Sequence, residues 1–144
     1  MSADTARGLI FGALMIHGLG HGGALGALAW IALRPSDPTG GWLAARSWLM
    51  PSLPIATTTA VAIGFWIISM LGFVAAALSF WGIALPGEAW RPLAIAGAVV
   101  SLVGITLFFG TWPPFNTLAA LVVNVAVLVS LLLLHWPADA VLRS

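Results

Sequence analysis

The chain has 144 residues, of which 61% are hydrophobic and 6% are charged, with a formal net charge of +1. This composition excludes an ordinary soluble domain and makes the lipid bilayer the expected surroundings. The basic residues are five arginines with no lysine, too few to form a nucleic-acid-binding surface. Cysteine is absent, which excludes disulfides, thiolate metal sites and CxxC redox chemistry by the chain itself.

The first apolar segment covers residues 8–33 and ends at Arg34-Pro35. It exceeds the roughly 20 residues that a membrane-spanning helix needs. Ala27-Leu28-Ala29 resembles a signal-peptide cleavage site, but the apolar stretch is too long for such a peptide, so we expect no cleavage. A surface connection follows over residues 34–54, in which residues 42–50 can form one or two helical turns at the membrane surface.

Three more apolar segments follow, over residues 58–85, 93–109 and 117–136. Asn116 is expected to be the N-cap of the last one. The connections between these segments are short, which favours antiparallel neighbours. Tryptophans gather at the expected helix ends, as in an aromatic belt. The sequence therefore predicts an all-α polytopic membrane protein, a single domain formed by an antiparallel bundle of four transmembrane helices.

The arginines indicate an orientation. If both termini lie on one side, that side carries Arg7, Arg91 and Arg143, and the opposite side carries Arg34 and Arg46. An excess of positive charge marks the cytoplasmic side, so we expect cytoplasmic termini.

A pair of histidines, His17 and His21, lies inside the first apolar segment. Residues four apart share one face of a helix, and at about 1.5 Å per residue the pair lies roughly 14 to 20 Å deep, near the bilayer centre. Ionisable groups at that depth usually face protein and mark a functional pathway. Small residues at four-residue spacing predict close helix packing: Gly8 and Gly12 before the pair, and then Gly18, Gly22 and Gly26.

The fourth segment offers partners for the histidines. Thr117, Asn124 and His135 share one helical face, and Asn124 is level with the pair, some 12 Å from its own end of the membrane. His135 lies close to the surface. Small polar stripes on the second and third segments, including Ser101, are expected to serve close helix packing.

Four interpretations of the polar residues remain open. A histidine can donate a hydrogen bond to Asn124 as a structural link between helices. His17 and His21 can present two imidazoles to a metal ion or a haem, although no intramembrane carboxylate or thiolate completes a ligand set. They can line a pocket for a quinone, a pigment or another lipophilic molecule. They can also belong to a proton or ion pathway.

Several motifs resemble a small, uncharacterised family of bacterial four-helix membrane proteins with an HGLxH-type first helix. The motifs are RGLIFG at residues 7–12, IHGLGH at 16–21, WRPL at 90–93 and WPPFNTLAA at 112–120. The chain is similar more distantly to DoxX-type proteins, some of which are linked to oxidoreductase systems. The resemblance implies the four-helix fold and a bacterial inner (plasma) membrane location, and it implies no catalytic residue.

We therefore expect a non-enzymatic subunit or binding module, working as a homo-oligomer or within a larger membrane complex. The alternative is a redox or lipophilic-ligand protein that uses His17 and His21, and a third interpretation is an oligomeric transporter or channel.

Overall fold

The computed structural model describes residues 2–32 and 47–138. This part of the chain is all-helical, as predicted, with four α-helices and two short helices in the order α1 (Ala3–Ala32), α2 (Ile55–Phe80), η2 (Gly87–Ala89), α3 (Trp90–Leu107), α4 (Pro114–Leu128) and η3 (Val129–Leu133). Four stretches are long and apolar enough to cross a membrane: Ala3–Gly26, Ile55–Phe80, Gly87–Leu107 and Pro114–Leu133.

The first helix begins before the apolar segment that predicted it. α1 starts at Ala3 instead of residue 8, because polar residues form an additional helical turn there. The Thr5 backbone N–H donates to Ser2 Oγ at 3.2 Å, as at an N-cap, and Asp4 places a negative charge near the positive end of the helix dipole.

Only the last part of the predicted surface connection can be described, since residues 33–46 lie outside the described residues. Residues 47–54 are not helical, so the expected surface helix does not reach residues 47–50. Trp48 Nε1 donates to the Thr106 carbonyl at 2.6 Å, which fixes this segment against the end of α3.

The second helix starts and ends earlier than predicted. α2 begins at Ile55, directly after Pro54, and ends at Phe80 instead of residue 85. The chain leaves the helix because Gly82 and Ala84 have left-handed backbone conformations, with φ of 74° and 64°. Ser79 Oγ donates to the Pro86 carbonyl and ties this turn back to α2.

Two expectations for the fourth helix, its N-cap and its last residue, are wrong. Asn116 is not the N-cap: the helix begins at Pro114, with Pro113 in the cap position, because proline suits the first turn of a helix. At the other end Leu134 N–H donates to the Val129 carbonyl at 3.0 Å, the wider spacing of a π-helix. The regular structure ends at Leu133 instead of residue 136.

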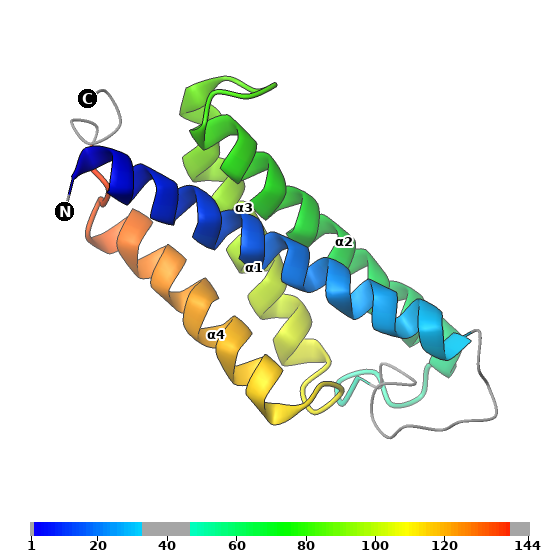
Figure 1. Cartoon of the computed structure of the whole chain (residues 1–144). Helices are drawn as coiled ribbons and strands as arrows, with labels where there is room; N and C mark the ends of the chain where they lie inside the picture. The colour runs from blue at the N-terminus through cyan, green and yellow to red at the C-terminus, as the bar shows by residue number, and fades with distance from the viewer. Residues whose placement is uncertain (1, 33–46, 139–144) are drawn as a thin grey trace.

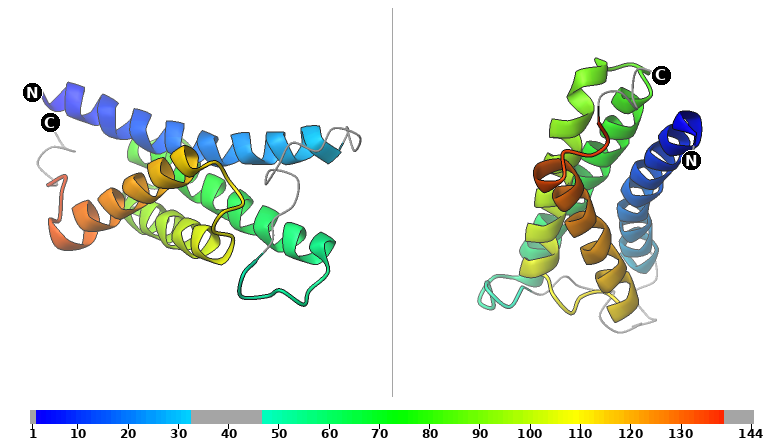
Figure 2. Two further views of the ribbon diagram at one scale, coloured as in Figure 1. Left: turned by 90° about the horizontal axis from the view of Figure 1, so that it is seen from below. Right: turned by 90° about the vertical axis from the view of Figure 1, so that its left-hand side faces the viewer.

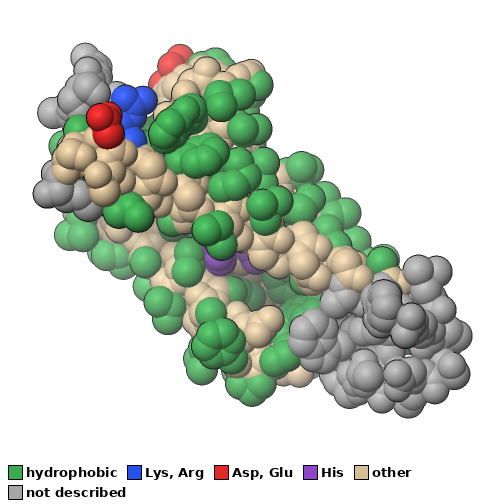
Figure 3. Space-filling view, viewed as in Figure 1, with side chains coloured by type: hydrophobic (Ala, Val, Ile, Leu, Met, Phe, Trp, Pro, Cys, Tyr) green, Lys and Arg blue, Asp and Glu red, His purple; other side chains and the backbone are tan. Residues whose placement is uncertain are grey.

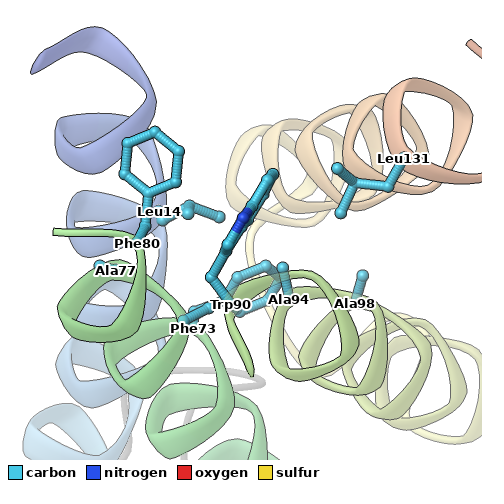
Figure 4. Packing of buried hydrophobic residues seen from close by; sticks show 9 residues of the cluster. Leu14, Phe73, Ala77, Phe80, Trp90, Ala94, Ala98 and Leu131 are labelled. Atoms are coloured by element: carbon cyan, nitrogen blue, oxygen red, sulfur yellow. The ribbon is translucent and has the colours of Figure 1, made fainter. Parts of the chain in front are cut away.

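The core is built around α2 and α3. In these two spans 33% and 39% of the residues are buried, against 17% in each of the α1 and α4 spans. α1 contacts chiefly α2, and α4 contacts chiefly α3. Trp90 packs edge-on against Phe80 with ring centroids 5.0 Å apart. Around this pair lies one apolar cluster to which all four helices contribute, including Leu14, Phe73, Ala77, Ala94, Ala98 and Leu131 (Figure 4).

The glycines of α1 divide into two groups. A Cβ at Gly18 would lie 3.0 Å from Phe73 Cβ, and one at Gly22 would lie 2.9 Å from Met70 Sδ, so both glycines allow α1 to approach α2. Gly12 and Gly26 have nothing within 4 Å of such a Cβ. The predicted packing role therefore holds within this chain for Gly18 and Gly22 and does not hold for Gly12 and Gly26.

The helices lie lengthwise along one another, and the start of α1 and the end of α4 are at the same end of the molecule (Figures 1 and 2). The visible face is largely apolar, and its described charged side chains lie at that end (Figure 3). Apolar side chains point outward all along the helices, among them Ile16, Leu71 and Val122, with exposed fractions of 73%, 57% and 67%.

Candidate functional site

Polar side chains from three helices meet between α1, α3 and α4. His17 Nε2 of α1 lies 3.0 Å from Asn124 Oδ1 of α4. Asn124 Nδ2 donates to Ser101 Oγ of α3 at 2.7 Å, and Ser101 Oγ lies 3.2 Å from His21 Nε2. These four residues form one hydrogen-bonded chain, which is called the polar chain below. The expected link between a first-segment histidine and Asn124 is confirmed for His17.

The inner members of this chain are sealed from the surroundings. Asn124 and Ser101 are fully buried, and His21 is 7% exposed. Buried polar groups need partners, because an unmade hydrogen bond in an apolar environment is costly. Each of the four side chains has at least one partner in the polar chain.

Aromatic rings fix the orientation of the imidazoles. The His21 ring is nearly parallel to those of Trp66 and Phe73, with interplanar angles of 12° and 11°. The His17 ring stands edge-on to Phe73, with centroids 4.6 Å apart. The two imidazoles are themselves edge-on at 5.0 Å. α2 thus supplies the wall against which both histidines lie.

A cavity of about 670 Å³ lies beside the polar chain, mainly between α1 and α4. Its volume falls in the range of small-molecule sites, roughly 300–1,000 Å³. His17 and His21 line it together with small residues of both helices, such as Gly20 and Ala120, and with Trp66 and Trp112. Figure 3 shows histidine side chains in the hollow between α1 and α4, so the cavity opens onto the apolar outer face of the molecule.

The other two predicted site residues lie apart from the polar chain. Thr117 lines the cavity, but its hydroxyl donates to the Pro113 carbonyl at 3.3 Å. His135 does not share the site: it is exposed and lies beyond the π-helix with a left-handed φ of 48°. The spacing from Asn124 to His135 predicted a common face because it assumed a regular α-helix, and the π-helix changes that register.

Few side chains at this site could bind a metal ion or a haem. The described residues contain no group of three or more His, Cys, Asp or Glu that could hold a metal ion. Of the described histidine, aspartate and glutamate residues, His17 and His21 are those that line the cavity, and both come from the same helix.

Two residues of the site were not singled out from the sequence. Ser101 was assigned to helix packing, yet it joins Asn124 to His21. Its depth was the available signal, because at about 1.5 Å per residue it lies some 16 Å from the start of α3, level with the histidines. Trp66, the one tryptophan placed well inside a predicted span, lines the cavity beside His21.

No protein-family model, curated protein or solved structure matches this chain. The resemblance to DoxX-type proteins stays a prediction, and the function has to be inferred from the chemistry of the site.

Proposed function

We propose that the chain is a multi-pass protein of the bacterial inner membrane, with four antiparallel transmembrane helices and cytoplasmic termini. Four apolar helices of sufficient length support this arrangement, as does the position of the start of α1 and the end of α4 at the same end of the molecule. Arg7 lies in the first turns of α1, and Arg91 donates to the Pro137 carbonyl just after the end of the helical structure, while Arg143 follows in the sequence. The positive-inside rule then favours cytoplasmic termini over the side that carries Arg34 and Arg46.

Within the membrane the protein acts as a non-enzymatic binding module that holds a lipophilic molecule between α1 and α4. The observation that carries this proposal is the 670 Å³ cavity, which is lined mostly by apolar residues, with His17, His21, Asn116 and Thr117 as its polar lining. Concave apolar sites with a few convergent polar groups are typical of small-molecule binding. The lining residues carry no formal charge in the described part of the chain, which favours an uncharged ligand.

A cavity that opens onto the outer face is reached from the lipid phase. Phe115, Gly20 and Gly23 line the cavity and are exposed, with 81% of Phe115 accessible. A ligand dissolved in the bilayer enters sideways between α1 and α4 and does not need to pass through the loops.

The experiment uses a matched pair of glycine variants on the same helix. Gly20 lines the cavity and Gly26 does not, and a Cβ added at either position would have no atom within 4 Å. Gly20→Leu is therefore expected to fill the cavity without disturbing the helices, and Gly26→Leu should leave it open. Protein purified in mild detergent is extracted with organic solvent, and the extract is analysed by mass spectrometry.

We expect one apolar molecule per chain in the wild type and in Gly26→Leu, and a loss of at least tenfold in Gly20→Leu. Equal recovery from both variants would contradict binding in this cavity. Visible absorption spectra and elemental analysis of the same samples test the haem and metal interpretations: a pigment or metal lost in Gly20→Leu would identify the ligand as that group.

A second candidate function is docking against a membrane partner through the outer face of α1, either as a homo-oligomer or in a larger complex. Gly12 and Gly26 favour this second function. A Cβ at either position would have no atom of this chain within 4 Å, so another backbone could approach closely there. Here Gly26→Leu is expected to abolish association in mild detergent and Gly20→Leu to preserve it. A wild type that is monomeric and free of partners would exclude this candidate.

A further inference from the structure

Each histidine of the polar chain has a second ring nitrogen without a partner. His17 and His21 both use Nε2 in the chain, and neither Nδ1 makes a hydrogen bond with the described residues. The buried side-chain nitrogen and oxygen atoms that lack a partner are Ser47 Oγ, Trp66 Nε1 and Ser69 Oγ. The two Nδ1 atoms are not among these sealed atoms, so they are accessible from the cavity that both rings line.

The direction of the hydrogen bonds in the polar chain determines whether each Nδ1 is a donor or an acceptor. Asn124 Oδ1 only accepts, so His17 Nε2 carries a hydrogen and His17 Nδ1 is an acceptor. Ser101 Oγ accepts from Asn124, and His21 Nε2 is the one further partner of this hydroxyl among the described residues, so we assign the Ser101 hydrogen to a bond with His21 Nε2. His21 then carries its hydrogen on Nδ1, which is a donor. The two imidazoles therefore present one acceptor and one donor to the cavity.

Reversing the direction of the hydrogen bonds in the polar chain gives the same result. If the Asn124 amide is turned over, its nitrogen donates to His17 and its oxygen accepts from Ser101, and Ser101 accepts from His21. His17 Nδ1 then becomes the donor and His21 Nδ1 the acceptor. In both directions neutral imidazoles present one donor and one acceptor to the cavity.

We propose that the ligand carries a neutral hydroxyl group at the end of an apolar body, as in a long-chain alcohol, and that this hydroxyl donates to one histidine and accepts from the other. The inference rests on the proposed function of the cavity. With hydrogen bonds of about 2.8 Å and a tetrahedral oxygen, one hydroxyl bridges two nitrogens about 4.6 Å apart. The centroids of the two imidazole rings are 5.0 Å apart, which is a comparable separation.

The remaining walls fit the apolar body and disfavour a charged headgroup. Ala13, Ala24, Ile105 and Val123 line the cavity, and its lining within the described part of the chain contains no Arg or Lys that would pair with a carboxylate or a phosphate. An ion without a counter-charge at this depth is strongly disfavoured. A carbonyl group would satisfy only the donor, so it is a poorer match than a hydroxyl.

The test compares four chemical probes on the wild-type protein in dioleoyl phosphatidylcholine vesicles. The probes are hexadecanol, hexadecyl methyl ether, hexadecane and palmitate, and each competes with dibromohexadecanol, which quenches the fluorescence of the cavity tryptophans. Trp66→Phe and Trp112→Phe variants identify the quenching that comes from the cavity. Hexadecanol is expected to compete about five- to tenfold more strongly than the ether, which lacks the donor, because one hydrogen bond contributes about 1 kcal/mol.

The outcomes separate the two proposals. Equal competition by the alcohol, the ether and the alkane would overturn the hydroxyl assignment and leave lipophilic binding in place. Stronger competition by palmitate than by hexadecanol would overturn the assignment of a neutral polar group to the ligand. If dibromohexadecanol produces no saturable quenching and no molecule co-purifies with the protein, the binding function itself fails.

Histidine variants provide a second measurement. His21→Phe keeps an aromatic ring between Trp66 and Phe73 and removes one of the two hydrogen-bonding nitrogens, so it is expected to bring hexadecanol down to the competition strength of hexadecyl methyl ether in the wild type. His135→Asn is the control, because it removes a histidine outside the cavity at a left-handed position that asparagine tolerates. Unchanged discrimination between alcohol and alkane in His21→Phe would overturn the proposal.

Discussion

Replacing Asn124 by leucine tests the polar chain as a link between helices. Asn124 is fully buried and bonds both His17 of α1 and Ser101 of α3. Leucine has a similar size and removes both bonds. Hydrogen bonds between membrane helices contribute about 0.6 kcal/mol on average and up to about 1.7. We therefore expect Asn124→Leu to lower the free energy of unfolding by about 1–3 kcal/mol.

A double-mutant cycle isolates the bond that joins α1 to α4. His17→Phe removes that bond alone, so it should cost less than Asn124→Leu, and the double variant should cost about as much as Asn124→Leu by itself. The expected coupling is about 0.6–1.7 kcal/mol. The assay is equilibrium unfolding of the four proteins by dodecyl sulfate in mixed micelles, followed by circular dichroism.

The refuting result is additivity. Residues that do not interact add to within about 0.3–0.5 kcal/mol, so a coupling below that value would show that His17 and Asn124 are not bonded in the folded protein. His135→Phe combined with Asn124→Leu is the matched control, because His135 makes no hydrogen bond to the polar chain within the described residues. This pair should be additive.

Two further predictions concern packing and tautomers. A Cβ at Gly72 would lie 3.0 Å from the Gly97 backbone, whereas one at Gly64 would have no neighbour within 4 Å. Gly72→Ala should therefore destabilise the protein by about 1–3 kcal/mol in the same assay and Gly64→Ala should not; equal effects would refute close approach of α2 and α3. Solid-state ¹⁵N NMR of histidine-labelled protein should find His17 and His21 in opposite neutral tautomers. Identical tautomers would contradict a continuous polar chain.

The periodicity of the sequence predicted the parts of the fold that depend on regular helices. His17 and Asn124 were expected at the same depth from residue counts alone, and the structure joins them at 3.0 Å. This succeeded because a helix rises by a constant amount per residue, and both residues lie within regular α-helix.

Prediction failed where local backbone chemistry departs from a regular helix. His135 was placed on the face of Asn124, but the π-helix lies between them and His135 itself has a left-handed backbone conformation. Asn116 has the side chain of an N-cap, yet Pro113 and Pro114 start the helix earlier. Such features depend on single turns, which hydrophobic periodicity does not report.

The partner of a polar residue depends on the rotation of each helix about its axis. Ser101 lies in a stripe of small residues that fits plain helix packing equally well. Its bonds to Asn124 and His21 could therefore be identified only from the structure. The cavity could not be predicted either. It exists because α1 packs chiefly on α2 and α4 chiefly on α3, a choice among neighbours that apolar segments of similar composition do not specify.

The small residues between α1 and α2 have an effect on the cavity although they lie outside it. Gly18 does not line the cavity, and it sets how closely α1 approaches Phe73 and Val74 of α2. A larger side chain at this position would push α1 away from α2 and alter the width of the opening toward α4. Under the proposed function, substitution at this remote position would therefore tune the size of molecule that the cavity accepts, with every residue that lines the cavity left unchanged.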